Sequence, residues 1–547
     1  MNSHVVITEA PQINYRIDYV ALPKNYGSAE YYKRDDVKAI IETVYKNLND
    51  LNERTGFADD LVKYKQILIK PNLVSVYHSA GLADTDYPES TDPRVFDAVV
   101  SYVHQYTTRI SIIESSGKPM PTSTSFKVSG IDRIAKRYGA ALYALETLPV
   151  VRYLLPKAEV MKEVYIPDIL QDVVKGEAYY ISVPKLKTNL YTGVTLGFKN
   201  AMGTIPYFLR ERNHTYRINK KLADLLYLFQ PNLVVIDGII GGEGNTPAPV
   251  DPVDVGVIIS GNHAVEVDRV ATRVMGIYPD EIMLMKEAFD RGFKDPGVTV
   301  TGKIKVVPFR RAISSLMDEN FVNRYPNVLA LAGHILPHAP KIPDVNAVTP
   351  EIARQLEMAC DGGCLAALRS GFDYIHYSPK PKYDFPLIVI IGEGVLFEGK
   401  RYWFDREGTP YSDDEIRSLS QPKLTLGNCA QGMNDCAKFK APGCCDPSKC
   451  MLAATAAGGV TFPLLTMQNK ALSHFVLSLL GTVLKRSFWI MRGRWVDCYR
   501  EHIDKIYEIP ELSDEDKVKD FIEWPLPKMT IAIKVKCIKD QFTLLQL

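Results

Sequence analysis

The chain has 547 residues, of which 46% are hydrophobic, 24% charged and 10% aromatic. Its 65 Lys and Arg residues nearly balance its 64 Asp and Glu residues, which gives a net charge of +1. This composition is typical of a globular protein of about two or three domains and excludes a disordered chain. The charge balance excludes a strongly basic nucleic-acid binder, so no nucleic-acid partner is expected.

Segments for targeting and membrane insertion are not evident in this sequence. The N-terminal residues lack the basic and then apolar pattern of a secretory signal. No stretch reaches the roughly 18 apolar residues that a transmembrane helix needs. The first 359 residues contain none of the nine cysteines, a distribution that is unusual for a secreted disulfide protein. We therefore expect a reducing compartment and a cytoplasmic location.

The first 300 residues alternate between helical and strand patterns. Apolar residues at a spacing of three and four predict helices, and short apolar runs that end in polar residues or proline predict buried strands. The alternation predicts an α/β fold with a mostly parallel sheet and helices on both faces. Ligands bind such sheets beyond the carboxyl ends of the strands. Helices are expected at 36–49, 93–103 and 264–276, and strands at 66–70, 109–114, 179–183 and 233–236.

The chain beyond residue 300 predicts a second, smaller unit. Its segment 301–350 is rich in proline and has a helical pattern at 312–322. Two buried strands, 386–391 and 423–426, are each followed by glycine. We therefore predict four regions: a main α/β domain at 1–300, a connector at 301–350, a cysteine-rich α/β unit at 351–460, and a helical or irregular region at 461–547.

Polar residues that follow the predicted strands of the main domain indicate an anion pocket. Four lysines lie in or beside strand ends, where their ammonium groups would attract phosphate or carboxylate. Nearby carboxylates would pair with these lysines or poise one of them as a base. The predicted anion- or substrate-binding residues are Lys70, Asn72, Lys185, Asn200, Asp237, Glu243 and Asn245. The predicted catalytic residues are Lys187, Lys199, His214 and Glu114.

Several strings of the first half follow one another in a specific order. They are Lys-Pro-Asn at 70–72, Pro-Lys-Leu-Lys at 184–187, Thr-x-Gly-x-Lys-Asn-x-x-Gly at 195–203, Asp-Gly at 237–238, and Glu-Gly-Asn-x-Pro at 243–247. This order resembles the bacterial and archaeal family called domain of unknown function 362, over roughly residues 65–300. Members often carry ferredoxin-type cysteine clusters, so the resemblance implies an iron–sulfur and electron-transfer context. The regular ferredoxin run of four cysteines is absent here.

An irregular set of cysteines takes the place of that run. Thiolates in this number suit an iron–sulfur cluster, with a four-iron, four-sulfur cluster favoured, or zinc. Buried thiols and a redox disulfide are the alternatives. A strand followed by Gly-x-Cys-Ala, and then by Gly-Cys, resembles the cluster-binding loops of the small subunits of hydrogenases and respiratory quinone oxidoreductases. The predicted metal ligands are Cys360, Cys364, Cys429, Cys436, Cys444, Cys445 and Cys450.

Two other patterns beyond residue 300 resemble known motifs but lack a required feature. His334 and His338 have helical spacing, but Pro337 lies between them and no Glu accompanies them, so they do not predict a zinc site. Gly392-Glu393-Gly394 follows a strand but lacks the third glycine of a dinucleotide-binding turn.

The leading interpretation is a cytoplasmic redox enzyme or electron-transfer protein with an iron–sulfur cluster. A small anionic substrate or a flavin would bind near the lysines and exchange electrons with the cluster and with a protein partner. The alternative is a lyase, racemase or transferase that acts on an anionic metabolite through a lysine base, with zinc or no metal. A further alternative is a scaffold that binds a partner through its C-terminal region. Residues 474–495 combine apolar, aromatic and basic side chains, so they predict a helix that packs on the core or contacts a partner or a membrane surface.

Overall fold

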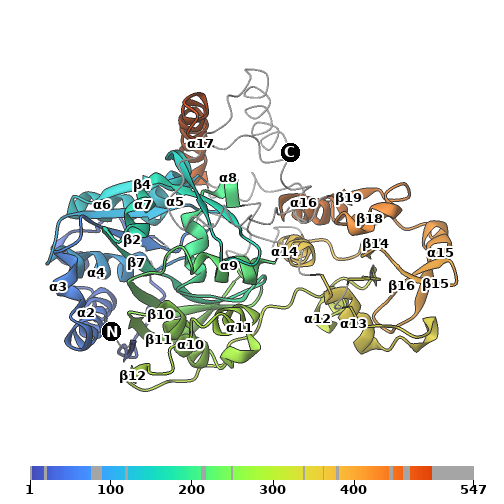
Figure 1. The fold of residues 1–547 in the computed structure, drawn as a ribbon, viewed down its shortest axis with the longest axis horizontal. Helices are drawn as coiled ribbons and strands as arrows, with labels where there is room; N and C mark the ends of the chain where they lie inside the picture. Colours follow the sequence, from blue (N-terminus) through green and yellow to red (C-terminus); the bar gives the residue numbers. More distant parts are fainter. Residues whose placement is uncertain are drawn as a thin grey trace.

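A computed structural model describes residues 3–17, 21–74, 89–117, 121–210, 217–247, 250–336, 339–360, 363–376, 381–442, 447–459 and 469–495. Two sheets with flanking helices form two units that lie side by side, and α14 lies where they meet (Figure 1). The predicted α/β class with mostly parallel sheets is confirmed.

The larger sheet belongs to the N-terminal unit. Its central strands β10, β7, β2, β3 and β4 are all parallel, whereas β11 runs antiparallel to both β1 and β10. In spatial order its strands are β12 (Thr299–Thr301), β1 (His4–Glu9), β11 (Asp251–Gly261), β10 (Leu233–Glu243), β7 (Ala178–Val183), β2 (Gln66–Pro71), β3 (Ile110–Glu114) and β4 (Ala141–Ala144). The short strands β8 (Lys185–Asn189) and β9 (Gly193–Thr195) extend beyond the end of β7, and β8 pairs with β10. A separate ribbon pairs β5 (Val150–Leu154) with β6 (Glu163–Pro167).

The spacing of apolar residues and the capping of helix ends explain where the helices of this unit form. In α2 (Asp35–Thr55) a buried apolar stripe at helical spacing packs against the sheet. α4 (Pro93–His104) begins after Asp92, whose side chain accepts a hydrogen bond from the backbone N–H of Arg94 at 2.8 Å. The other helices of at least four residues are α1 (Ala29–Tyr32), α3 (Phe57–Leu61), α5 (Thr122–Ser129), α6 (Ile131–Tyr138), α7 (Gln171–Val174), α8 (Tyr207–Arg210), α9 (Ile218–Leu225), α10 (Ala264–Val274) and α11 (Met283–Asp290), with a 3-10 helix at Lys199–Thr204.

The smaller sheet has a parallel core and an antiparallel edge. Strands β13 (Val328–Ala332), β14 (Leu387–Ile391), β18 (Lys423–Leu426) and β19 (Phe439–Ala441) are parallel neighbours. β13 lies within the predicted connector, so the second sheet begins before residue 351. The antiparallel strands are β15 (Val395–Phe397), β16 (Lys400–Phe404) and β17 (Pro410–Ser412), and the helices are α12 (Glu319–Arg324), α13 (Pro350–Met358), α14 (Cys364–His376), α15 (Asp413–Ser418) and α16 (Pro447–Ala457).

The helix predicted at 312–322 is shorter and later in the structure. Only α12 is helical there, and it begins after Asp318, which accepts a hydrogen bond from the N–H of Asn320 at 3.0 Å. The preceding backbone N–H groups bond to other elements instead: Ile313 donates to Asn245 and Leu316 to Glu357, each at 2.8 Å. These tertiary bonds replace the first turn of the expected helix.

The last described helix, α17 (Asn469–Met491), returns to the N-terminal unit, where it rises beside α5 (Figure 1). Phe475 and Ile490 are buried in the two core clusters of that unit. The indole N–H of Trp489 donates to the carbonyl of Thr147 at 2.9 Å. Among the described residues, no helix is both long enough and apolar enough to cross a membrane.

Candidate functional site

The carboxyl ends of β2 and β3 bring Lys70 and Glu114 into a buried ion pair. The side-chain nitrogen of Lys70 lies 2.8 Å and 2.9 Å from the two carboxylate oxygens of Glu114, and it also donates to Asn200 at 2.8 Å. Lys70 is only 1% exposed. Burial lowers the pKa of Lys70 to about 8, and burial raises the pKa of Glu114, although each partner opposes the shift of the other. The two charges therefore stabilise each other directly, because burial keeps water away from both.

Two further lysines of β8 pair with acidic groups. Lys185 donates to Asp237 at 2.8 Å, and the same carboxylate accepts the backbone N–H of Asp92 at 2.7 Å. Burial raises the pKa of Asp237 against the opposing effect of Lys185. Lys187 donates to the backbone carbonyl of Glu89 and lies 3.3 Å from its carboxylate. Burial lowers the pKa of Lys187, although Glu89 opposes this.

Lys199 is the lysine of the set that has no carboxylate partner among the described residues. It is 8% exposed, and no described residue accepts a hydrogen bond that its ammonium group donates. Burial and, next, the positive charges of Lys187, Arg210 and Lys70 lower its pKa to about 7. The side chain thus lies among other cations, and its lowered pKa makes the neutral amine accessible near neutral pH. A group in this state can act as a base or bind an anion.

Residues of the Thr-x-Gly-x-Lys-Asn-x-x-Gly string form the turn before Lys199 and contact the lysine cluster. The buried carboxylate of Asp268 in α10 accepts the N–H groups of Gly197 at 2.6 Å and Phe198 at 3.1 Å, which fixes the turn before Lys199. A Cβ atom at Gly197 would lie 2.7 Å from that carboxylate. Asn200 accepts from Lys70 and donates to Ser182 at 3.0 Å. The contacts around Lys199 therefore account for the glycine and the asparagine of the string.

Gly203 closes the string against the Lys70–Glu114 pair. A Cβ atom there would lie 2.5 Å from the nitrogen of Lys70 and 2.6 Å from a carboxylate oxygen of Glu114. We expect Gly203→Ala to lower the free energy of unfolding by about 1–3 kcal/mol, because the buried pair must move apart. Urea titration measures the change. Gly432→Ala is the control, since nothing lies within 4 Å of the added Cβ, and an equal loss in both variants would contradict this packing.

The lowered pKa of Lys199 makes a direct prediction for titration. In protein labelled isotopically at the lysine Cε, the resonance missing from Lys199→Arg should titrate with a midpoint near pH 7, because burial and the neighbouring cations lower the pKa of Lys199 to about 7. Because the folded protein resists protonating this amine, its stability falls as pH decreases from the unfolded pKa through about 7. Lys199→Met should therefore gain stability relative to the parent over the same range. A midpoint near that of an exposed lysine would contradict the prediction.

The other predicted residues of the N-terminal unit have different places. The side chain of Asn72 lies near Lys70, where it donates to Asn200 at 3.3 Å and leaves its carbonyl oxygen unpartnered. Glu243 accepts the N–H of Arg310 at 2.7 Å, outside the lysine cluster. Asn245 donates to Asp373 at 2.8 Å and so joins the two units. His214 lies outside the described residues.

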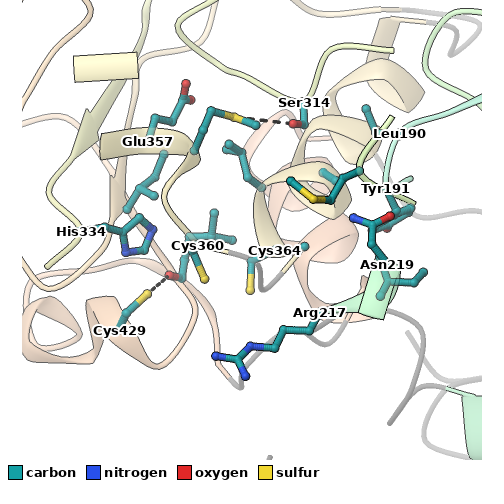
Figure 2. Close-up of a pocket in the computed structure, with 18 of the residues that line it drawn as sticks. Leu190, Tyr191, Arg217, Asn219, Ser314, His334, Glu357, Cys360, Cys364 and Cys429 are labelled. Atoms are coloured by element: carbon teal, nitrogen blue, oxygen red, sulfur yellow. Dashed lines mark hydrogen bonds between the residues drawn. The ribbon is translucent and has the colours of Figure 1, made fainter. Parts of the chain in front are cut away.

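A second candidate site is a cavity of about 390 Å³ between the two units. Cys360, Cys364 and Cys429 line its wall on the side of the second unit, together with His334. Figure 2 shows the three thiol side chains turned toward a common space, with the side chain of Arg217 reaching toward it from the N-terminal unit. The sequence predicted that separated sulfur atoms would gather, and the structure brings three of them to one cavity.

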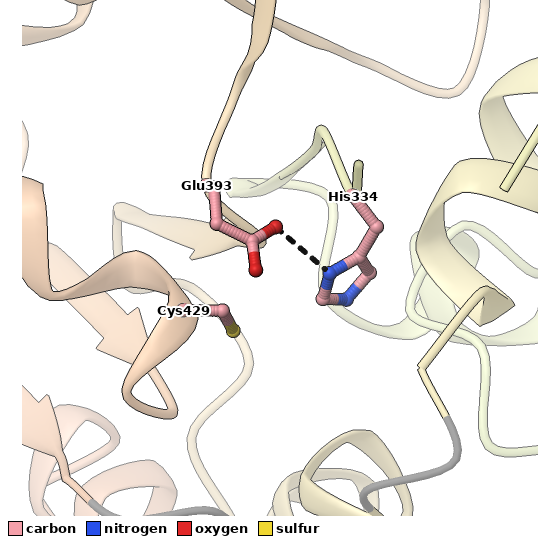
Figure 3. Close-up of side chains that lie close together, drawn as sticks. All are labelled: His334, Glu393 and Cys429. Atoms are coloured by element: carbon pink, nitrogen blue, oxygen red, sulfur yellow. Dashed lines mark ion pairs between the residues drawn. The ribbon is translucent and has the colours of Figure 1, made fainter. Parts of the chain in front are cut away.

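Three adjacent parallel strands end at this cavity with the same pattern. Glycine follows each strand, and a potential metal ligand follows each glycine by one or two residues: His334 after β13, Glu393 after β14 and Cys429 after β18. One ligand atom from each lies within 4.8 Å of the others, as Figure 3 shows. The Nδ1 atom of His334, a residue only 3% exposed, lies 3.6 Å from the Glu393 carboxylate and makes no hydrogen bond to any described residue.

Glycine is required where these strand ends approach one another. Gly392 has φ +87°, and a Cβ atom there would lie 2.7 Å and 2.8 Å from the carbonyl group of Gly333. The backbone N–H of Gly394 donates to that carbonyl at 2.8 Å, which ties the β13 and β14 ends together. The glycines therefore let His334 and Glu393 come within reach of one ion.

Not all predicted ligands reach the cavity. Cys436 packs beside the apolar cluster around Trp403, and its thiol donates to the carbonyl of Met433 at 3.2 Å. Cys450 is buried in the core of the second unit within α16. Cys444 and Cys445 lie outside the described residues. The structure thus separates Cys436 and Cys450 from the three cavity thiols.

Helix α14 connects the cavity with the lysine cluster. It begins at Cys364, directly after Gly363 with φ +73°, whereas Cys360 follows the end of α13, so the two cysteines do not share one helix face. Tyr374, ten residues or about 15 Å further along the helix, lies close enough to Glu89 for that carboxylate to raise its pKa, after the larger effect of burial. Glu89 in turn holds Lys187.

Sequence reasoning missed His334, Glu393, Asp268 and Glu89. For the first two a signal was present, since a glycine and then a ligand follow β13 and β14 just as they do β18. The helical spacing of His334 with His338, which lies outside the described residues, gives no indication of Glu393 or Cys429. Asp268 and Glu89 carry no local signal, because their roles depend on contacts with residues far away in the chain.

The fold and these sites define a two-unit α/β protein with a lysine–carboxylate cluster at one sheet edge and a thiol-lined cavity between its units. Residues 67–273 match the model of the family described as Domain of unknown function (DUF362), which confirms the resemblance stated for the N-terminal half. Over 247 residues the chain is 26% identical to Thylakoid-associated protein sll1697 of Synechocystis sp., an alignment that covers 44% of this chain and 72% of the relative. No solved structure matches the chain.

Proposed function

We propose that this chain is a metal-centred redox protein, an oxidoreductase or an electron carrier, whose centre is an iron–sulfur cluster held in the inter-unit cavity. The single observation that carries the proposal is the arrangement of Cys360, Cys364 and Cys429 around one space, with the imidazole of His334 beside them. Thiolates are the ligands that iron–sulfur clusters prefer, and a four-iron, four-sulfur cluster is the favoured type.

The donor set fits such a group. The buried Nδ1 of His334 faces the cavity ligands, and its nearest acceptor among the described residues is the Glu393 carboxylate at 3.6 Å, beyond hydrogen-bond distance. A buried ring nitrogen with so long a contact is costly unless something binds it. The cavity volume of about 390 Å³ leaves room for a bound group. Glycines at the strand ends leave backbone close to the thiols, and backbone N–H groups can bond to cluster sulfide. A bound cluster would supply one-electron transfer.

The lysine cluster would hold the anionic reactant. Lys199, without a carboxylate partner among the described residues, would bind the anion, with Lys187, Lys70 and Arg210 adding positive charge. Its neutral form would accept a proton from the reactant. Glu114 and Glu89 would hold Lys70 and Lys187 in place. A flavin phosphate or a small carboxylate would suit this charge, and α14, which begins at the cavity, carries Tyr374 near the Glu89 carboxylate.

A second candidate is a non-redox enzyme, a lyase, racemase or transferase, with zinc and a lysine base. Its support is that single atoms of His334, Glu393 and Cys429 lie within 4.8 Å of one another, a span that suits one ion. His, Glu and Cys are all ordinary zinc ligands. Here Lys199 would act as the base.

Purification without oxygen distinguishes the two candidates. The redox proposal expects brown protein with broad visible absorption and about four iron atoms per chain. Colourless protein with about one zinc per chain would contradict it and support the second candidate. Protein with neither metal would contradict both.

The cytoplasmic location stays a prediction. The name of the cyanobacterial relative associates that protein with the thylakoid. We infer that association with a membrane surface suits this chain as well as a location in the cytoplasm does, and fractionation of cells that express the full chain would separate the two.

A further inference from the structure

The outer face of α17 carries an apolar stripe that no described residue covers. Its large side chains follow at intervals of three and four residues, so they lie on one face of the helix. Leu477 and Leu484 are 69% and 70% exposed, although aliphatic side chains of this size are usually inside. The stripe consists of Leu477, Leu480, Leu484, Phe488 and Met491.

The opposite face of the helix is fixed to the N-terminal unit, so the stripe cannot turn inward. Phe475 and Ile490 are buried in the core clusters there. After the helix, the backbone carbonyl of Arg494 accepts the N–H of Val150 at 3.1 Å, and its guanidinium pairs with Asp168 at 3.2 Å. Trp495 is buried against the same unit. The stripe is therefore presented outward on a rigid base.

Basic side chains border the stripe. His474, Lys485 and Arg492 are exposed, and helical spacing places them together along one side of the apolar residues. The guanidinium of Arg492 lies over the ring of Phe488, 4.6 Å from its centroid. Segment 469–495 contains no Asp or Glu. An apolar stripe bordered by cations and free of acidic residues matches the boundary between the acyl chains and the anionic headgroups of a bilayer.

We propose that α17 docks this protein on an anionic lipid surface, lying in the plane of the interface with the stripe inserted among the acyl chains. The arrangement does not cross the membrane, in agreement with the absence of a spanning helix among the described residues. The proposal is independent of the redox centre, because no residue of the stripe lines the cavity.

Vesicle flotation of the full chain tests the proposal. The protein should float with phosphatidylcholine vesicles that contain phosphatidylglycerol, and binding should weaken with salt. Replacing Leu477, Leu484 and Phe488 with Ser should lower the partition coefficient by roughly a hundredfold or more, since each buried side chain is worth about tenfold or more. The control replaces Leu396 and Val62, which are 60% and 50% exposed elsewhere, and should float as the parent does.

Charge reversal tests the basic border separately. Lys485→Glu with Arg492→Glu should lower binding to the anionic vesicles by roughly tenfold or more and leave the weak binding to phosphatidylcholine alone unchanged. A parent chain that fails to float would overturn the proposal, as would a stripe variant that floats equally well. If the stripe variant differs from the parent only in the mass measured by light scattering, a second copy of the chain covers the stripe. That result also overturns the proposal. Metal content, measured on each variant, should not change.

Discussion

Replacing Cys429 with serine is expected to remove the metal from the protein and abolish its visible absorption. Cys429 is the residue that both arrangements share: it lines the cavity with Cys360 and Cys364, and it completes the set with His334 and Glu393. A serine hydroxyl stays protonated at neutral pH and is a poor ligand for iron or zinc. We expect the metal content to fall below about a tenth of the parent value, because binding needs every ligand of such a site.

The matched control for this variant is Cys436→Ser. Cys436 lies seven positions further along the chain, on the apolar cluster around Trp403 and outside the cavity lining. Its thiol donates to a carbonyl three residues back, as the thiol of Cys429 does, so both variants change the same local hydrogen bond. This variant should keep its metal and its spectrum. If Cys429→Ser kept the metal, or if Cys436→Ser lost an equal amount, the proposed cavity site would be wrong. Circular dichroism would show whether either variant is unfolded.

The second large effect is expected for the buried pair at the lysine cluster. Lys70→Met should lower the free energy of unfolding by about 3–5 kcal/mol, because Glu114 is left charged or must take up a proton where almost no water reaches it. Glu114→Gln should have a similar effect, since the ammonium of Lys70 then lacks its counter-charge. Denaturant titration at neutral pH measures both.

A double-variant cycle separates this pairing from ordinary loss of packing. Lys70→Met combined with Glu114→Gln should be less destabilised than the sum of the two single changes, because neither charge is then buried alone. The control is Lys127→Met, whose exposed pair with Asp132 at 3.0 Å is screened by water and should change stability little. Additive losses, or a loss no greater than in the control, would contradict the role given to the pair.

The elements with strong local signals were predicted well. The strand at 66–70 is β2 with one more residue, and the helix at 93–103 is α4, because an apolar run and a capping Asp-Pro are local features. The helix at 312–322 was wrong in its first half, since Asn245 and Glu357 accept the backbone N–H groups there. The strand β13 was missed because its partner β14 lies almost sixty residues away.

In the candidate site, too, features with a local sequence signal were predictable and features set by distant contacts were not. The four lysines were recognisable because each lies beside the end of a buried strand, and the sheet brings those ends together. Which lysine lacks a carboxylate was not predictable, because the partners Glu114, Asp237 and Glu89 come from separate loops and strands. The sequence offered seven cysteines as candidate ligands of one centre without indicating which of them bind. The fold places three described thiols and His334 at the cavity and brings Glu393 beside His334 and Cys429.

Diffraction from crystals of the full chain, grown without oxygen and measured on both sides of the iron absorption edge, tests the central claim most directly. We expect a strong anomalous peak inside the inter-unit cavity, in contact with the sulfur atoms of Cys360, Cys364 and Cys429. A cavity without an anomalous peak, or an iron peak bound elsewhere in the chain, would contradict it.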